Sequence, residues 1–360
     1  MAIVSKTGVK VSAKRLKNHY EALKSLDYTD AAIMQSLGFP VMDAAQAATT
    51  LGYSGGVPLQ FLQTFMPGVV RVLQAPLKLE EAIGFTQAGS WEDVEIVQEL
   101  SEGLGFAREY GDLQEKPNVT YNREFLRQDV VRFEVGVESH ALEAARASRG
   151  QINDLQEKTN TAALILKQIL NDVGFNGYQT ANTSTYGLLN NPNLPAYVTA
   201  ANGVSASPLW STKTWDEKQK DIIAMANGLM TQSKGLVDAM STPTTLIVPV
   251  SLWNFFQTTT SLGYSLMKWI EDSYRGNMRV MSAFNMDGAN GGLNAMYLFA
   301  DNVNDGISTD SGETFMQVIP TRFMPLNTAI TVTGQKTAYT AGTAGTFVKR
   351  PFAVYRLTGV

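Results

Sequence analysis

The chain has 360 residues, 44% of them hydrophobic, so it can bury a sizeable core and form about two domains. It has no cysteine and only two histidines, which excludes disulfides, thiolate metal sites and cysteine nucleophiles and leaves few places for histidine-based catalysis. The net charge of −4 excludes a generally basic nucleic-acid coat, and the charged fraction of 17% lies below the roughly 25% typical of soluble domains. A surface with few charges fits a protein that is partly covered by neighbours.

The N-terminal sequence has no apolar segment of the kind that a secretory signal contains. Nowhere in the chain is there a run of about 18 apolar residues, so no membrane-spanning helix is expected. We therefore expect a protein that is made and folded in a cytoplasm and has no membrane partner.

The first 75 residues combine a basic start with an apolar arm. Residues 1–30 are compatible with a helix and carry six bases against a single acid, Glu21, before Asp27. Two interpretations of this start stay open: an ordinary amphipathic helix with a charged face, or a segment that contacts packaged DNA through phosphates alone. The candidate DNA-facing residues are Lys10, Lys14, Arg15 and Lys17. Residues 40–75 are apolar and rich in turn residues, which predicts an extended arm that packs on another surface.

Two strand-like segments then predict a long antiparallel hairpin with charged sides. Apolar and charged residues alternate with the two-residue period of a strand in residues 91–110, and again in residues 119–137 up to Val137. The polar, turn-rich segment GDLQEKPNVT connects them. Because a lone hairpin is only marginally stable in water, it needs a surface to lie on.

Helical and strand-like segments alternate after the hairpin, which indicates the α+β class. A short helix over 139–148 precedes a long helix with apolar residues at three/four spacing, which we expect to end at Gly174. Residues 175–208, rich in Asn, Gly, Thr and Pro, mark the predicted domain boundary. A capping-box pattern, Thr214 to Glu217, predicts a helix over 215–233. Strands are predicted at 246–248, 279–283, 295–300, 313–319 and 346–357, with a further helix at 251–256.

Two motifs that could carry chemistry are incomplete. The segment GYSGG at 52–56 matches the G-x-S-x-G pattern of serine hydrolases, but it lacks the buried strand before it and the helix after it. A hydrolase that uses Ser54 therefore stays a remote alternative to a glycine turn. Residues 301–306 resemble a calcium loop, yet Val303 occupies the third ligand position and Gly312 stands where a bidentate glutamate belongs. The sequence predicts no catalytic residue, no cofactor and no metal site.

The order of motifs in residues 91–192 resembles a known family. It begins with Trp91-x-Asp93 and GFAREYGD at 105–112, continues through a charged strand, a short helix and the long helix, and closes with YGLLNNP at 186–192. This order is similar to that of tailed-bacteriophage major capsid proteins with the HK-97-like fold, which bacterial encapsulins share. The Gly-Leu-Leu-Asn-x-Pro element after the long helix is the most specific single piece of the resemblance.

The resemblance implies four parts of the chain. They are an N-terminal arm (1–80), a hairpin region called the E-loop (81–130), a P domain with the long helix as its spine (131–178 and 325–360), and an A domain (179–324). In that family the E-loop lies across an adjacent subunit. The residues expected to form inter-subunit ion pairs are Glu109, Asp112, Glu115, Lys116, Arg123, Glu124 and Arg127. A solvated hairpin rim is the alternative interpretation of these charges.

The function that the resemblance implies is that of a major capsid protein. Such a protein self-assembles into hexamers and pentamers of an icosahedral virus head that encloses double-stranded DNA, and is assembled in the host cytoplasm into the virion. Portal, scaffold or decoration proteins are further expected partners. Some relatives cross-link a lysine to an asparagine, but neither residue can be matched here, so no cross-link is predicted. An encapsulin-type compartment that encloses a cargo enzyme stays the alternative with the same fold.

Overall fold

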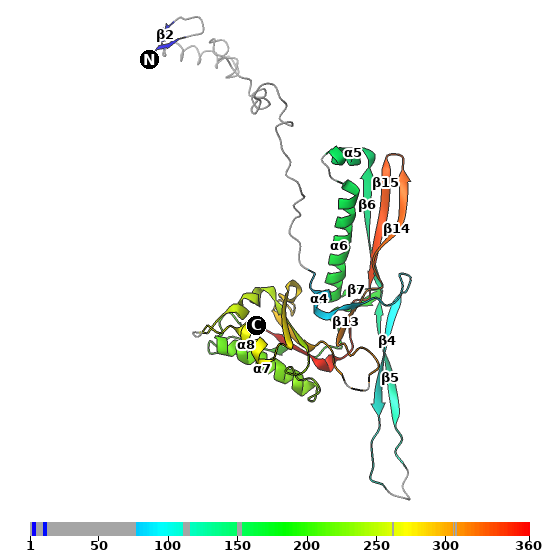
Figure 1. Cartoon of the computed structure of the whole chain (residues 1–360), viewed down its shortest axis with the longest axis vertical. Helices are drawn as coiled ribbons and strands as arrows, with labels where there is room; N and C mark the ends of the chain where they lie inside the picture. The colour runs from blue at the N-terminus through cyan, green and yellow to red at the C-terminus, as the bar shows by residue number, and fades with distance from the viewer. Residues whose placement is uncertain are drawn as a thin grey trace. The chain divides into compact units, whose positions relative to one another are not determined.

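The structure is a computed structural model of the chain (Figure 1). It describes residues 2–4, 10–12, 77–110, 116–149, 153–260, 263–304, 306 and 308–360. The chain divides into two units, residues 1–73 and 74–360. In the first unit, β1 (Ala2–Val4) pairs with β2 (Lys10–Ser12) in antiparallel register, so this part of the expected helical start forms strands. The predicted arm at 40–75 lies outside the described residues.

The hairpin of the second unit consists of β4 (Glu95–Leu104) and β5 (Thr120–Asp129), paired from Glu95↔Asp129 to Leu104↔Thr120. The prediction that its second strand continues to Val137 is wrong. The chain leaves the hairpin at Val130, and β6 (Val131–His140) pairs instead with β15 (Gly334–Thr343). The alternation after residue 130 belongs to a strand half-covered by a helix, and a period of two does not tell which partner a strand takes.

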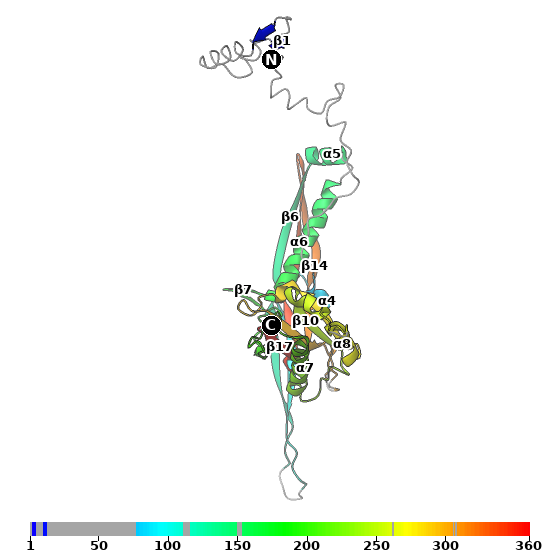
Figure 2. The ribbon, with the colours of Figure 1, turned by 90° about the vertical axis from the view of Figure 1, so that its left-hand side faces the viewer.

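The long helix lies along one face of a three-stranded sheet (Figures 1 and 2). The sheet has the order β14–β15–β6, with β14 spanning Thr321–Thr331, and α6 (Asp154–Asn176) buries Leu166 and Leu170 against Ile319 and Ala341. Helix α5 (Ala141–Arg149) lies at the end of this layer and buries none of its residues. The β14–β15 hairpin was not predicted from the sequence.

The predicted end of the long helix at Gly174 is wrong. The helix continues to Asn176, and Gly177, with a φ of 72°, forms the C-terminal cap. Gly174 instead provides space for a close contact, because a β-carbon at this position would lie 2.0 Å from Cδ2 of Leu79. Leu79 is buried and begins the short helix α4 (Leu79–Ile83), whose first backbone N–H donates to Oδ1 of Asn171 at 3.1 Å. The glycine therefore marks where α4 is seated on the spine helix.

Replacing Gly174 with alanine is expected to destabilise the subunit by about 1–3 kcal/mol, because the added methyl group overpacks the Leu79 contact. Urea unfolding of the purified subunit measures this loss. Gly103→Ala is the matched control, since a β-carbon there meets nothing within 4 Å. Equal stability of the two variants would contradict the close contact.

The five-stranded sheet β11–β10–β12–β17–β9 forms the centre of the remaining region. Its two central strands are buried along their whole length, β10 (Thr244–Pro249) and β12 (Ala295–Ala300). Leu246 and Leu298 face one core with α7, whereas Ile247 and Phe299 face a second core on the other side. Burial on both faces explains why these strands are continuous apolar runs in the sequence. The other strands are β9 (Val198–Thr199), β11 (Met278–Ala283) and β17 (Val354–Thr358).

Helices and short strands make up the rest of the second unit. Helix α7 (Trp215–Gln232) begins with the predicted capping box of Thr214 and Glu217, so that prediction is confirmed. The predicted helix at 251–256 is a 3-10 helix, η2 (Val250–Gln257). The remaining elements are β3 (Phe85–Thr86), β7 (Tyr178–Thr180), β8 (Thr183–Thr185), α8 (Leu266–Ser273), η3 (Phe284–Met286) and β13 (Phe315–Val318).

The last predicted strand, 346–357, is interrupted. It consists of β16 (Thr346–Val348), the 3-10 turn η4 (Pro351–Ala353) and β17, because Pro351 has no N–H to donate to a ladder and opens the turn. β17 lies between β12 and β9, in the sheet formed by residues assigned above to the A domain. The division into P and A domains otherwise stays a prediction. The α+β class is confirmed.

Candidate assembly surfaces

The register of the β4–β5 hairpin gives it two chemically different faces. Side chains of directly paired residues share a face, so even-numbered residues of both strands point one way and odd-numbered residues the other. At its base the even face packs on the subunit itself, where Ile96 and Leu126 contact a small core with Phe347. The buried side chain of Gln128 donates to the carbonyl of Thr346 at 3.0 Å. The even face is therefore partly occupied by the subunit's own body.

The odd face carries a row of apolar side chains that are about half-exposed. Val97, Tyr121 and Phe125 are 47%, 59% and 48% exposed. We name these three residues the aromatic ridge. Near the hairpin tip Phe106 and Val119 are also exposed. Exposed apolar patches of this kind mark interaction surfaces, because leaving them in water costs free energy.

Two of the arginines expected to bond to another subunit have partners within the hairpin. The guanidinium of Arg123 lies 3.1 Å from the Glu99 carboxylate, and that of Arg127 lies 3.8 Å from Glu95. Arg123 also lies over the Tyr121 ring at 4.9 Å. Exposed ion pairs of this kind contribute only about 0–1 kcal/mol each. These arginines therefore connect the two strands of the hairpin on the odd face. Their role in contacts between subunits stays a prediction.

The other residues predicted to form inter-subunit ion pairs or to face DNA are exposed without an ion pair, or their side chains are not described. Glu109, Lys116 and Glu124 are exposed, and within the described part of the chain none of the three forms an ion pair. Glu124 lies on the even face, opposite the ridge. Lys10 is in β2, although its side chain is not described. The predictions at Asp112, Glu115, Lys14, Arg15, Lys17 and Ser54 lie outside the described residues.

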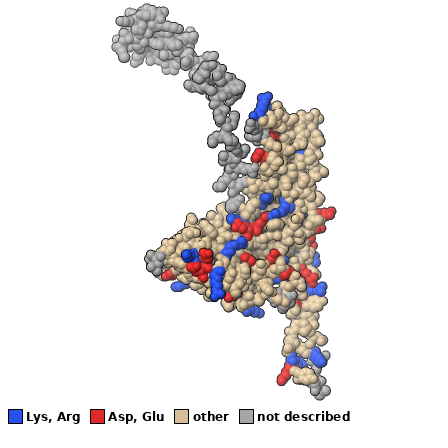
Figure 3. Space-filling model, in the orientation of Figure 1, with Lys and Arg blue, Asp and Glu red and all other residues tan. Residues whose placement is uncertain are grey.

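A second exposed apolar surface lies where the three-stranded sheet ends, and it was missed in the sequence. Ile330, near the end of β14, and Val332, in the turn that follows, are almost fully exposed, and much of Leu142 in α5 is exposed as well. The two elements are joined by a hydrogen bond from the N–H of Ala141 to the carbonyl of Thr333. The Thr- and Ile-rich run before Gly334 is a strand signal that could have identified this hairpin. On the face of the unit that Figure 3 shows, most of this end carries no charged side chain.

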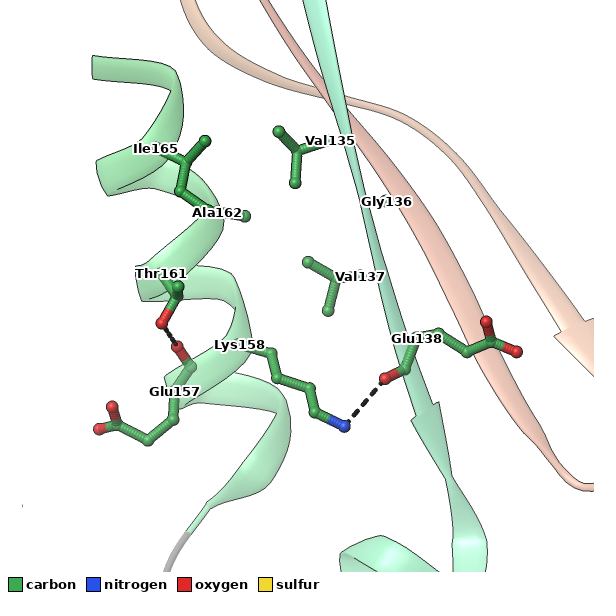
Figure 4. Close-up of a pocket in the computed structure, with 9 residues that line it drawn as sticks. All are labelled: Val135, Gly136, Val137, Glu138, Glu157, Lys158, Thr161, Ala162 and Ile165. Atoms are coloured by element: carbon green, nitrogen blue, oxygen red, sulfur yellow. Dashed lines mark hydrogen bonds between the residues drawn. The ribbon is translucent and has the colours of Figure 1, made fainter. Parts of the chain in front are cut away.

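An apolar groove separates α6 from β6 (Figure 4). Val135 and Val137 of β6 face Ala162 and Ile165 of α6 across it, and its volume is about 410 Å³. Charged residues line one end, where Lys158 donates to the carbonyl of Glu138 at 3.0 Å. Contacts with Glu143 and Asp154 raise the pKa of Lys158, so it stays protonated at neutral pH. Ile165 is 37% exposed, so the residues that the structure describes leave this side of the groove open.

The remaining polar clusters offer little for catalysis or metal binding. In the loop that resembled a calcium site, Val303 is buried and Asp310 binds the guanidinium of Arg350 at 2.5 and 3.1 Å. That arginine holds the pKa of Asp310 below its usual range. Across the described ranges no group of three or more His, Cys, Asp or Glu side chains could hold a metal ion. Likewise, none of the helices in these ranges is long and apolar enough to cross a membrane.

Comparisons with solved structures show that this architecture is shared. The capsid of Myoviridae phage XM1 matches with a TM-score of 0.67 at 16% identity, over 85% of this chain and 100% of that one. The capsid of a native GTA particle matches at 0.57 and 11%, over 86% and 98%. Mycobacterium phage Ogopogo matches at 0.53 and 12%, over 83% and 97%. At these identities the likeness shows the fold, which is the HK-97-like fold of phage capsids.

The sequence itself shows the family. A search of curated proteins found no match. The family model described as Pa193 gp26 major capsid protein, however, matches residues 48–359, which is most of the chain. The match includes the hairpin, the spine helix and the five-stranded sheet, so it covers the surfaces described above. The chain therefore belongs to the Pa193 gp26 family of tailed-phage major capsid proteins, which form the shell of the virus head.

Proposed function

We propose that copies of this chain assemble into the hexamers and pentamers of an icosahedral head that encloses double-stranded DNA. The observation that supports this most is the β4–β5 hairpin, which is anchored at its base and exposes the aromatic ridge along the odd face. A two-stranded hairpin of this length is marginal alone, so a neighbouring copy that covers the ridge would stabilise it. The proposed role is structural, with no reaction assigned to the chain.

The hairpin would stabilise the shell through a weak contact between copies that is repeated many times. Each buried square ångström of apolar surface contributes about 25 cal/mol, and three ridge side chains supply only part of a subunit interface. Every copy both gives a hairpin and receives one, so the contact is multiplied over the shell.

In this proposal the N-terminal arm is 1–80 and the E-loop is 81–130. Strand β17 is grouped with the A domain because it lies in the five-stranded sheet of that domain. Portal, scaffold or decoration proteins would be the further partners.

Nuclease treatment of purified particles tests what the shell encloses. A virus head made during infection should protect double-stranded DNA of uniform length from added nuclease. A compartment of the encapsulin kind would instead contain a co-purifying protein and no protected DNA. Protected DNA supports the proposal, and cargo protein without DNA contradicts it.

We expect that the basic start contributes to DNA retention. Replacing Lys10, Lys14, Arg15 and Lys17 with glutamine removes charges that could contact phosphates, so DNA should be lost from heads at lower salt. A matched variant replaces four exposed bases of the second unit, Lys220, Lys234, Lys268 and Arg275. DNA content is measured after salt challenge. Retention equal to that of the matched variant would reject the contact and leave the amphipathic-helix interpretation.

A further inference from the structure

Residues 79–86, which comprise α4, Gly84 and β3, are bound to several other parts of the second unit, and we name them the α4–β3 segment. On the spine helix, the N–H of Leu79 donates to Oδ1 of Asn171 at 3.1 Å, and the buried Leu79 side chain lies beside Gly174. Figure 1 shows α4 at the end of α6 that lies away from α5. Because a hydrogen bond is directional, the Asn171 contact fixes the orientation of the segment as well as its position.

The segment is also bound to β14 of the three-stranded sheet. The guanidinium of Arg322 forms an ion pair with the Glu80 carboxylate, and its Cζ lies 3.7 Å from the centroid of the Phe85 ring. The side chains of the pair are 41% and 39% exposed, so the pair adds little to stability. An arginine that is paired with a carboxylate and stacked on a ring is nevertheless confined to one orientation. The segment is therefore attached both to α6 and to the three-stranded sheet, which we together name the spine layer.

On its other side the segment is bound to the five-stranded sheet through Arg279. This residue belongs to β11, at the edge of that sheet, and its Nη2 donates to the carbonyls of Glu81 at 2.9 Å and Ala82 at 3.2 Å. Nη2 also donates to Oγ1 of Thr245 in β10 at 3.4 Å, so the guanidinium is held by its own sheet. Hydrogen bonds from a charged donor are stronger than those between neutral groups. Arg279 therefore joins the five-stranded sheet to a segment that is bound to the spine layer.

The spine layer and the five-stranded sheet also meet directly. Phe175 of α6 shares a core with Ile247 of β10 and Phe299 of β12. Asn285, in the 3-10 turn η3 after β11, donates to Asp172 of α6 at 3.2 Å, at an exposed position. Apolar contacts are not directional, so the sheet can turn by a small angle against the spine layer while most of this core stays buried. The hydrogen bonds of the α4–β3 segment are directional, so they oppose such a turn.

We propose that the α4–β3 segment limits the angle between the spine layer and the five-stranded sheet, with Arg279 as the residue that couples the two. The curvature of a closed shell follows from the shape of the subunits that form it. Copies that hold this angle within a narrow range would close into shells of one size, whereas copies released from the segment would close into shells of several sizes. The inference rests on the proposed shell function and adds a conformational device within one copy.

Arg279→Met in the full-length chain tests the coupling. Methionine removes the donors and keeps a long side chain, and because Arg279 is exposed, the change leaves no buried cavity. Hydrogen–deuterium exchange in residues 79–86 of the unassembled subunit should become several-fold faster, and electron microscopy should show particles with a wider range of diameters. Arg279→Lys should give an intermediate result, since an ammonium group can still donate to a carbonyl. Arg275→Met is the matched control, because Arg275 is an exposed arginine four positions earlier, and it should change neither result.

Release of the segment from the spine layer should have the same effect as loss of Arg279. Asn171→Ala combined with Arg322→Met removes polar contacts on that side and leaves Arg279 in place. Adding Arg279→Met to this double variant should not widen the range of diameters further, because the coupling is already interrupted. Shells from the double variant that are as uniform as those of the unmodified protein would overturn the inference.

The variant Ile222→Val separates a general loss of stability from the loss of coupling. It removes one carbon from the core on the α7 side of the five-stranded sheet, whereas Leu79 and Ala82 belong to the core on the other side. Its shells should therefore keep a uniform size. A range of diameters as wide as that of Arg279→Met would show that any loss of stability has this effect, which would overturn the inference.

The remaining outcomes separate this inference from the proposed function. Uniform shells of unchanged diameter from Arg279→Met, or unchanged exchange in residues 79–86, would overturn the inference while the shell function stands. A folded Arg279→Met chain that forms no particles would overturn it too, because the segment is proposed to limit an angle and not to hold copies together. Failure of the unmodified protein to form particles would reject the shell function instead.

Discussion

A subunit that lacks residues 108–122 is expected to fold and to form no particles. Joining residue 107 to Arg123 removes the tip together with Tyr121 of the ridge, but it leaves the ladder from Glu95↔Asp129 to Ser101↔Arg123. The anchoring contacts of Ile96, Leu126 and Gln128 lie in the part that remains. The body of the subunit should therefore keep its stability while the interface is shortened.

Two measurements on the deletion variant test whether it folds and whether it assembles. Circular dichroism and thermal unfolding should match those of the unassembled full-length subunit, and electron microscopy should show no shells. The control is the variant with Lys220, Lys234, Lys268 and Arg275 replaced, which keeps the hairpin and both exposed apolar surfaces and should still form shells. Particles of normal size from the deletion variant would contradict a role of the hairpin in assembly.

The replacement Asp221→Asn is expected to lower the free energy of unfolding by about 3–5 kcal/mol, because it leaves a buried ammonium group without a counter-charge. Lys213 and Asp221 form an ion pair of 2.5 Å, and their side chains are 1% and 6% exposed. Oδ2 of Asp221 also accepts from the indole N–H of Trp210 at 2.8 Å. The pair fixes the segment before α7 to that helix within the core under the five-stranded sheet.

Urea unfolding of the assembly-deficient deletion variant measures this effect without interference from the shell. Asp216→Asn is the matched control on the same helix, since Asp216 is exposed and should change stability by no more than about 1 kcal/mol. A loss for Asp221→Asn as small as that of the control would contradict the importance of the buried pair.

Features that depend on local chemistry could be predicted from the sequence. The capping box at Thr214 sets the start of α7 through hydrogen bonds within four residues, and β12 was predicted with its observed bounds. The predictions that were wrong concern features that depend on residues far away in the sequence. Gly174 resembles a helix stop, but its lack of a side chain serves the contact with Leu79, ninety-five positions away in the chain.

The predicted site shows the same division between local and distant information. The alternation of apolar and charged residues in 91–110 indicates a strand, and the charges of the hairpin favour ion pairs between subunits. Only the register shows that Arg123 and Arg127 share a face with Glu95 and Glu99, and that the apolar ridge lies between them. A shift of one residue would move every side chain to the opposite face, so the nature of each face follows from the pairing.

Electron microscopy of the purified full-length protein is the most direct test of the central claim. If the exposed ridge is an assembly surface, the protein should form closed shells of uniform size, and the Phe125→Ser variant should form them only at higher concentration. A full-length protein that remains monomeric at every concentration at which it stays soluble, with and without a co-expressed scaffold protein, would contradict the account.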